Sequence, residues 1–188
     1  MNDYWENRYK SGGNSGPGSY NESATFKATT INNYINKLNI KTISDYGCGD
    51  GNQIGLLSDY ELYHGYDVSN FIIDKNVATF ANKNNMFFYK NINDLPDSDL
   101  NMSLDVIYHL SEFSDYVDYL IRLFNKSKKY VLIFSTDEDR EYTNDHFCSR
   151  KFTVWIEKNI SDFELVEVIE GGSGVNFYLY EKITKNNN

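Results

Sequence analysis

Residues 41–57, KTISDYGCGDGNQIGLL, contain the clearest motif of the chain, three glycines at every second position. An apolar strand over 42–46 runs into a turn in which every second residue is glycine. The residues after this turn, 52–57, can form a helix. A strand, a glycine turn and a helix in this order are typical of nucleotide-binding α/β folds. Glycine lets a ligand approach the backbone, and the helix start offers free N–H groups.

The spacing of these glycines separates two kinds of nucleotide site. A dinucleotide fingerprint has the pattern G-x-G-x-x-G. Counted from Gly47 the third glycine would fall on Asn52, and counted from Gly49 it would fall on Ile54. The spacing therefore argues against a nicotinamide-dependent oxidoreductase.

The pattern that is present, D-x-G-x-G-x-G over 45–51, resembles the first motif of class I S-adenosylmethionine-dependent methyltransferases. In that family an acidic residue ends the next strand, and here Asp67 follows ELYHGY at 61–66. The resemblance implies that Asp67 binds both ribose hydroxyls, because a carboxylate offers two acceptors. It implies S-adenosyl-L-methionine as cofactor and S-adenosyl-L-homocysteine as product. The implied contacts from this part of the chain are Asp45, Gly47, Cys48, Gly49, Gly51, Asp67 and Val68.

The opening segment extends the resemblance to short bacterial methyltransferases that begin with Trp-x-x-Arg-Tyr, Gly-Gly and Ser-Gly-x-Gly-Ser. The matching residues are Trp5, Arg8, Tyr9, Gly12, Gly13, Ser15, Gly16, Gly18 and Ser19. One interpretation of residues 1–22 is a flexible leader. The other, which the aromatic residues favour, is a flap over cofactor and substrate, with Tyr9 and Tyr20 as substrate contacts. The expected domains are this flap, a methyltransferase domain over 23–184 and a polar tail over 185–188.

The rest of the pattern predicts alternating strands and helices. We expect helices over 23–38 with Ser23 as cap, over 69–81 with Ser69 as cap, and over 152–160. The second has Ile73, Val77, Phe80 and Ala81 inward. A helix with an apolar stripe follows the fourth strand, and the stripe consists of Phe113, Tyr116, Val117, Leu120, Ile121 and Phe124. Further strands are expected over 86–89, 99–104, 130–135, 163–169 and 175–182, and the short link between the last two makes them antiparallel. The resemblance implies an α/β fold with a single Rossmann-like, doubly wound, seven-stranded sheet, mostly parallel with one antiparallel strand.

Ligands of parallel sheets lie beyond the carboxyl ends of the strands. The family places an acidic residue near the adenine amine, where this chain has Asn91 followed by Ile92, with Asp94 as the alternative. By the same resemblance, the backbone near Ser103 lies beside the methionine portion of the cofactor.

The catalytic candidates follow from the chemistry of a sulfonium methyl, which is already activated. The protein must align the acceptor, exclude water and supply a base where the acceptor needs one. His109 is the first candidate because imidazole titrates near neutrality, and a backbone-bonded histidine at a helix start is the alternative. Asp105 is the second candidate, as base or orienting partner, with a helix N-cap as the alternative.

Three basic residues are candidates for substrate binding. Lys27 falls outside the expected apolar stripe of its helix, so we expect a solvated lysine, with a ligand contact as the alternative. His146 and Arg150 belong to the long loop over 136–151 and can receive a phosphate or carboxylate, although Arg150 and Lys151 can also be a solvated pair. The three scattered histidines predict no metal site.

Composition limits the class of protein. A chain of 188 residues predicts one domain, and its net charge of −9 makes a nucleic-acid partner unlikely. Two cysteines are too few for a disulfide framework. The chain has no run of about 18 apolar residues for a membrane span and no apolar leader, so we expect a cytoplasmic protein. Its oligomeric state stays open.

The predicted function is methyl transfer to a small polar acceptor, with oxygen favoured and a sugar- or phosphate-containing building block of surface glycans as one candidate. One alternative is a methyltransferase for RNA or protein. It needs a shared basic patch from Lys126, Lys128, Lys129, Arg150 and Lys151. The other alternative is a non-catalytic module that binds S-adenosylmethionine.

Overall fold

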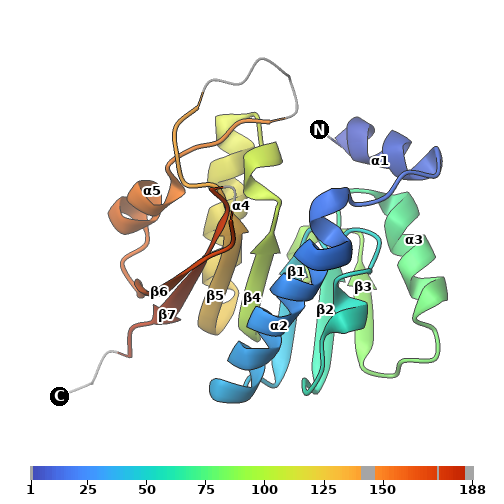
Figure 1. The fold of residues 1–188 in the computed structure, drawn as a ribbon, viewed down its shortest axis with the longest axis horizontal. Coiled ribbons are helices and arrows are strands. Elements are labelled where there is room, and N and C mark those ends of the chain that lie inside the picture. The colour runs from blue at the N-terminus through green and yellow to red at the C-terminus, as the bar shows by residue number, and fades with distance from the viewer. Residues whose placement is uncertain (1, 141–146, 173, 185–188) are drawn as a thin grey trace. The chain divides into compact units, whose positions relative to one another are not determined.

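The structure is a computed structural model that describes residues 2–140, 147–172 and 174–184 (Figure 1). These residues form two compact units, one up to Asp99 and one from Leu100 onward. The strands follow the order β3-β2-β1-β4-β5-β7-β6, in which β4 (Ser98–Leu104) begins in the first unit and ends in the second. This α/β topology of seven strands confirms the predicted fold class. The predicted boundaries at residues 22 and 184 remain predictions, and the tail over 185–188 lies outside the described residues.

In the first unit, three parallel strands direct their carboxyl ends to one edge. They are β1 (Thr42–Tyr46), β2 (Leu62–Tyr66) and β3 (Met86–Tyr89). Tyr46 is in register with Tyr66, and Tyr66 with Tyr89, so the three strands end side by side. The glycine turn after β1 and Asp67 after β2 are therefore neighbours.

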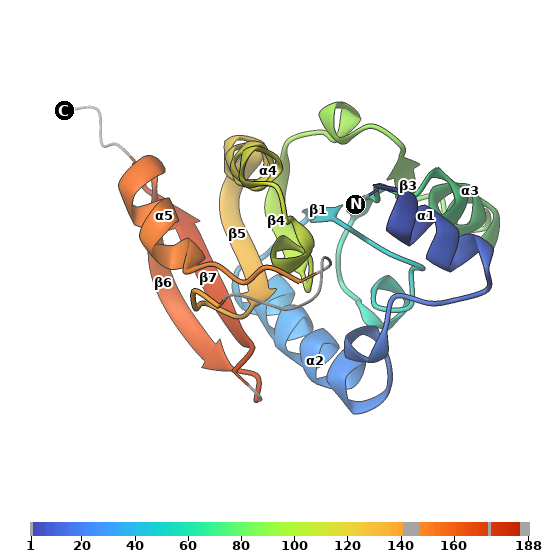
Figure 2. The ribbon, with the colours of Figure 1, turned by 90° about the horizontal axis from the view of Figure 1, so that it is seen from above.

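The helical elements of the first unit are α1 (Asn2–Lys10), η1 (Pro17–Ser19), α2 (Asn21–Lys37), η2 (Ile54–Leu56), α3 (Asn70–Thr79) and η3 (Ile92–Asp94). Figure 2 shows α1 running alongside α3, with which it is in contact. The helix predicted over 52–57 is only the short 3-10 turn η2.

The helix α2 begins earlier than predicted. Its N-cap is Tyr20 instead of Ser23, and the amide of Ala24 already donates to the Tyr20 carbonyl. Three- and four-residue spacing predicts Ala24, Ala28, Ile31, Ile35 and Leu38 on its inner face; the first four are buried and Leu38 is half-buried.

Ser69 caps α3 as predicted, since its hydroxyl accepts a hydrogen bond from the amide of Ile72. The predicted inner face was wrong at Val77, which is 52% exposed, and at Ala81, which is also exposed. Ile72 is buried beside Ile73 instead, and Phe80 is half-buried. The physical reason is a polar contact. In the next turn of the helix, Asn76 occupies the inner position. It is fully buried because its side-chain amide donates to the carbonyl of Gly49.

The second unit contains η4 (Ile107–His109), α4 (Phe113–Asn125), β5 (Ser127–Ser135), α5 (Phe152–Asn159), β6 (Phe163–Glu170) and β7 (Asn176–Lys182). The strand β7 runs antiparallel to both neighbours, with Leu132 opposite Leu179 and Val168 opposite Tyr178. This pairing confirms the antiparallel end of the sheet. Among the described residues, no helix has both the length and the apolar character that crossing a membrane requires.

The buried face of α4 is rotated from the predicted one. Its buried residues are Tyr116, Tyr119, Leu120, Leu123 and Phe124, whereas the predicted Phe113 and Ile121 are 58% and 38% exposed. Steps of three and four residues forward from Tyr116 reach positions 119, 120, 123 and 124 and leave out 117 and 121, and Phe113 is the first residue of the helix.

This rotation makes a testable prediction about stability. Phe124 is fully buried, with its ring 5.1 Å from that of Phe163 and 5.3 Å from that of Tyr180. We expect Phe124→Ala to lower the free energy of unfolding by about 3–5 kcal/mol in urea titrations. The control on the same helix is Phe113→Ala, for which we expect a loss below about 1 kcal/mol. Equal losses in the two variants would contradict the observed rotation.

Candidate functional site

The glycine turn is fixed to the end of β2 through its backbone. The amides of Gly47 and Cys48 both donate to the Tyr66 carbonyl, at 2.7 and 2.8 Å. At the centre of the turn, Gly49 has φ +57°, and an added Cβ would collide with Ser15 Oγ. A side chain at position 49 is therefore excluded both by conformation and by space.

Two side chains hold the backbone of Gly49 from opposite directions. Its N–H donates to Asp67 Oδ2 at 3.0 Å, and its carbonyl accepts from Asn76 Nδ2 at 2.7 Å. The peptide groups around Gly49 are therefore fixed between the residue that follows β2 and the inner face of α3.

Asp67 is the buried carboxylate of this edge. Its Oδ1 accepts from the amide of Ser69 at 2.9 Å, and its side chain is 6% exposed. Burial raises the pKa of Asp67 to about 6, although the hydrogen bonds from the Ser69 and Gly49 amides act in the opposite direction. Each carboxylate oxygen can accept two hydrogen bonds. Both oxygens therefore keep capacity for a pair of ligand hydroxyls, which fits a ribose.

Asp45 lies at the end of β1, just before the turn. Its Oδ2 accepts from the Tyr63 hydroxyl at 2.9 Å, while its buried Oδ1 has no hydrogen-bond partner in the described parts of the chain. Burial raises the pKa of Asp45 to about 6, against the opposing effects of Tyr63 and Lys27. A buried acceptor with spare capacity next to a glycine turn fits a positively charged donor on a ligand.

The prediction that Lys27 is solvated was wrong. Lys27 is 1% exposed and lowers the pKa of Asp45 by its charge. The reason is helical spacing, because Lys27 follows Ala24 by three residues and precedes Ile31 by four and so shares their inner face. The contact of Lys27 with a ligand stays a prediction.

Residues 2–20, named the strap from here on, lie against the glycine turn and the residues after Asp67. Ser15 and Asp50 exchange two hydrogen bonds, from Ser15 N to Asp50 Oδ2 and from Asp50 N to Ser15 Oγ, both 2.9 Å long. The Tyr20 hydroxyl donates to the same Asp50 Oδ2 at 2.8 Å. At the other end, Glu6 Oε2 accepts from Ser69 Oγ at 2.6 Å and from the Phe71 amide at 3.1 Å. The strap is thus attached on both sides of Gly49.

Tyr9 is the buried centre of the strap. It is 4% exposed, and its hydroxyl lies 3.1 Å from Ser15 Oγ. Burial and the nearby charge of Asp67 raise the pKa of Tyr9 well above its ordinary value. Its hydroxyl is therefore neutral and lies close to the turn.

The remaining candidates of the first unit lie on its surface or half-buried. Asn91 is exposed and caps η3, because its side chain accepts from the amide of Asn93 at 3.0 Å. Ile92 and Val68 are half-buried. The predicted adenine contact at Asn91 and Ile92 stays a prediction, and Asn91 still has its side-chain NH₂ group to offer as a donor.

The second unit brings Asp105 and Tyr108 together. Asp105 has φ +61°, its amide donates to the Phe134 carbonyl at 2.9 Å, and its Oδ1 accepts from the Tyr108 hydroxyl at 2.8 Å. The alternative that Asp105 caps the following helix was wrong, because the N-cap of η4 is Val106 and that of α4 is Glu112. A non-glycine residue in the left-handed region at a strand end is a frequent feature of functional sites.

His109 belongs to an aromatic group in the same unit. Its ring centroid lies 4.6 Å from that of Tyr108 and 5.9 Å from that of Phe147. Tyr108 and Phe147 are themselves stacked at 4.3 Å, and the Tyr108 carbonyl accepts from the Cys148 amide. Ser103, fully buried in β4, accepts from the Tyr119 hydroxyl at 2.8 Å.

The two predicted anion-binding residues have different outcomes. Arg150 donates to the carbonyls of Leu110 and Ser111, both at 2.6 Å, and its guanidinium lies 4.9 Å from the ring centroid of Tyr116. These contacts fix Arg150 to the start of α4, so a solvated pair with Lys151 does not describe it. His146 lies outside the described residues.

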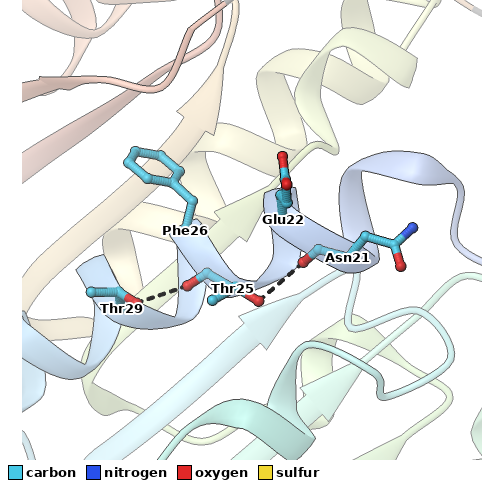
Figure 3. Close-up of a pocket in the computed structure, with 5 residues that line it drawn as sticks. All are labelled: Asn21, Glu22, Thr25, Phe26 and Thr29. Carbon is cyan, nitrogen blue, oxygen red and sulfur yellow. Dashed lines mark hydrogen bonds between the residues drawn. The ribbon is translucent and has the colours of Figure 1, made fainter.

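A hollow on α2 and the distribution of metal-binding side chains bear on the location of the site. A hollow on α2 is lined by Asn21, Glu22, Thr25, Phe26 and Thr29 (Figure 3). The hydroxyls of Thr25 and Thr29 donate to carbonyls of their own helix, so this hollow offers few free polar groups. Among the described residues, no group of three or more His, Cys, Asp or Glu side chains could hold a metal ion.

The sequence did not lead us to the residues that fix the turn and the strap, which are Glu6, Ser15, Asp50, Ser69 in its contact with Glu6, and Asn76. Asn76 had a usable signal, since an amide three residues after Ile73 interrupts the apolar face of α3. The partner of Asp50 had none, because Ser15 lies 35 residues earlier in the chain.

Comparisons with known proteins identify the fold. No protein-family model and no curated protein sequence matches the chain. Among solved structures, magnesium protoporphyrin IX methyltransferase from Synechocystis, with bound S-adenosylmethionine, is similar with a TM-score of 0.72 and 13% identity over 96% of this chain and 94% of that one. The N-methyltransferase NodS from Bradyrhizobium japonicum is similar with a TM-score of 0.69 and 11% identity over 87% and 99%. An S-adenosylmethionine-dependent methyltransferase from Clostridium acetobutylicum has a TM-score of 0.64 and 12% identity over 84% and 91%. The chain therefore has the Rossmann-like fold of these methyltransferases.

The raised pKa of Asp67 predicts how stability depends on pH. Because its folded-state pKa of about 6 exceeds the ordinary 3.8, the folded protein binds this proton more tightly than the unfolded chain between these values. The free energy of unfolding therefore falls as pH rises through this window, by about 3 kcal/mol for this group. The Asp67→Asn variant has no titrating carboxyl at this position. Relative to that variant, the wild type should lose this amount between pH 3 and pH 7 in urea titrations, and a constant difference would contradict the prediction.

Proposed function

We propose that this protein is a cytoplasmic enzyme that transfers a methyl group from S-adenosyl-L-methionine to a small polar acceptor, with an oxygen atom as the favoured target. One observation carries the proposal. The buried carboxylate of Asp67 accepts a hydrogen bond from the amide of Gly49, at the centre of the glycine turn. A carboxylate that can accept hydrogen bonds from a ligand and a backbone without side chains are therefore preorganised at the same edge of the sheet. The likeness in fold to the Synechocystis methyltransferase, which contains bound S-adenosylmethionine, supports the same cofactor.

The residues of the first unit fit such a cofactor by their chemistry. Asp67 offers acceptors to the two ribose hydroxyls, and the unpaired Oδ1 of Asp45 offers one to the ammonium group of the methionine portion. The backbone of Gly47, Cys48, Gly49 and Gly51 gives the close approach that side chains would prevent. Asn91, Ile92 and Val68 are proposed for the adenine end and Ser103 for the methionine end. When bound, S-adenosylmethionine supplies a methyl group that its sulfonium already activates.

Asp105 and His109 are the proposed acid–base residues. The Tyr108 hydroxyl and the Phe134 carbonyl hold Asp105 in its left-handed conformation, which fixes the direction of its carboxylate. His109 is fixed by its aromatic neighbours, and imidazole is a side chain that can accept a proton from an attacking hydroxyl. A hydroxyl acceptor must lose a proton as it attacks, whereas a phosphate or carboxylate oxygen does not. The base is therefore required only for the hydroxyl class.

The acceptor is proposed to be a sugar- or phosphate-containing metabolite. The structural relatives include a porphyrin methyltransferase and an N-methyltransferase by their names, so the fold leaves the acceptor open. Tyr9, Tyr20, Lys27, His146 and Arg150 are the proposed substrate contacts of the chain.

The basic residues of the second unit disfavour RNA or protein as substrate. Arg150 binds the carbonyls of Leu110 and Ser111 just before α4, whereas Lys126 is the C-cap of that helix. Thirteen residues separate helix start from helix end, or about 20 Å at 1.5 Å per residue. Two of the five basic residues that this alternative needs, Arg150 and Lys126, are therefore at opposite ends of α4, which favours a small acceptor.

A thermal-shift series tests the cofactor. Ligand at about 100 times its dissociation constant stabilises a protein by about 2.7 kcal/mol, which should raise the midpoint by about 5–10 °C for a chain of this size. We expect this rise with S-adenosylhomocysteine and S-adenosylmethionine, none with NAD, and a loss of the rise in Asp67→Ala.

The matched control is Asp99→Ala. Asp99 is also a buried carboxylate that accepts from two backbone amides, those of Lys41 and Thr42, but it lies at the amino end of β1. This variant should lower the midpoint of the free protein and keep the ligand-induced rise. A rise with NAD alone, or none with either adenosyl compound, would contradict the proposed function. A rise without turnover of any sugar, phosphate or carboxylate acceptor would favour a non-catalytic binding module.

A further inference from the structure

The residues proposed to bind the cofactor are covered in this structure. Asp67 is 6% exposed, Cys48 is 7% exposed, and Gly49 and Gly51 are buried. At Gly49 the covering atom is Ser15 Oγ, which belongs to the strap. An adenosyl ligand that must contact the turn and Asp67 therefore requires the strap to move away first.

The contacts of the strap with the turn are concentrated on one residue. Asp50 Oδ2 accepts hydrogen bonds from the Ser15 amide and the Tyr20 hydroxyl, and the Asp50 amide donates to Ser15 Oγ. Its other oxygen, Oδ1, accepts from the amide of Asn52 and so fixes the carboxylate to the turn itself. Asp50 thus joins the strap to the glycine turn at three points, and beside it Asn52 Nδ2 donates to the Ser19 carbonyl at 2.6 Å.

The chemistry of these contacts allows reversible opening. Burial and the bond to Asp50 raise the pKa of Tyr20 to about 12, so its hydroxyl stays protonated and donates at neutral pH. All of these contacts are hydrogen bonds between partly exposed groups, which exchange readily with water. Gly16, next to Ser15, has φ +89° with no atom within 4 Å of an added Cβ, so the backbone can turn there without a side chain in the way.

We propose that the strap is a gate over the cofactor site and that Asp50, through Ser15 and Tyr20, is the latch that holds the gate shut. This inference rests on the proposed function. Opening of the gate limits both entry and release of the adenosyl ligand, so the latch controls rates more than affinity. The attachment of Glu6 to Ser69 and Phe71 keeps α1 in place and acts as the fixed end about which the rest of the strap moves.

The test weakens the latch from the strap side, so that the glycine turn keeps its sequence. The variants are Ser15→Ala, Tyr20→Phe and the double variant. The control is Tyr130→Phe, which also removes a tyrosine-to-carboxylate hydrogen bond, the one to Glu181 in the second unit. Equilibrium dialysis with tritiated S-adenosylmethionine gives the dissociation constant, and a chase with unlabelled S-adenosylhomocysteine gives the release rate. The ratio of rate to constant gives the association rate.

In the double variant we expect release and association both to become about tenfold faster, with a dissociation constant within about threefold of wild type. Tyr130→Phe should match wild type in all three quantities. Unchanged release in the double variant would overturn the gate. Faster release with a tenfold larger dissociation constant would also overturn it, because the strap would then be a binding contact only.

A measurement without ligand separates this inference from the proposed function. Amide hydrogen exchange of residues 11–20 should become about tenfold faster in the double variant and stay unchanged in Tyr130→Phe. Wild-type protein that binds no S-adenosylmethionine would overturn the proposed function and the gate together. Wild-type binding with unchanged strap exchange and unchanged release in the double variant would overturn the gate alone.

Discussion

The hydrogen bond from the Gly49 amide to Asp67 is the interaction on which the rest of the first unit depends. It forms because β1 and β2 are parallel and end in register, which brings the residues after them together. It requires a left-handed turn without a side chain, since a Cβ at position 49 has no room. The carboxylate of Asp67 is buried there, and burial raises its pKa to about 6 against the opposing effect of this bond. This one contact therefore depends on the local sequence, on strand pairing and on electrostatics.

The strap gives this edge of the sheet a second layer. When nothing covers such a turn, its backbone amides and the neighbouring carboxylate are exposed. When it is covered, its buried donors need hydrogen-bond partners. Here Ser15 and Tyr20 satisfy Asp50, while Tyr9 adds an aromatic ring that excludes water from the neighbourhood of Asp67. In the proposed function the same layer would shield a reactive sulfonium from water, so closing the site and protecting the chemistry would be one event.

Much of the fold was predictable because its signals are local. The glycine turn, the buried strand YVLIFS within β5 and the Ser69 cap all follow from short-range pattern. The errors at Lys27 and Val77 arose where a polar side chain takes an inner position, which Lys27 does near Asp45 and Asn76 does at Gly49. Hydrophobic periodicity cannot anticipate such residues, because their partners come from other segments. The contact between Ser15 and Asp50 could not be predicted for the same reason. The role of Asp67 could be predicted because its position follows from the order of the strands.

An adenosyl ligand that lies on the glycine turn beside Asp67 should be visible in an NMR titration of amide signals. On addition of S-adenosylhomocysteine, we expect the largest shifts at the amides of Gly49, Gly51 and Ser69, with smaller shifts in the strap. Adenosine diphosphate ribose, which lacks the methionine portion, should leave the amides near Asp45 unshifted. Saturating S-adenosylhomocysteine that shifts none of these amides, or shifts only signals outside the first unit, would contradict the account.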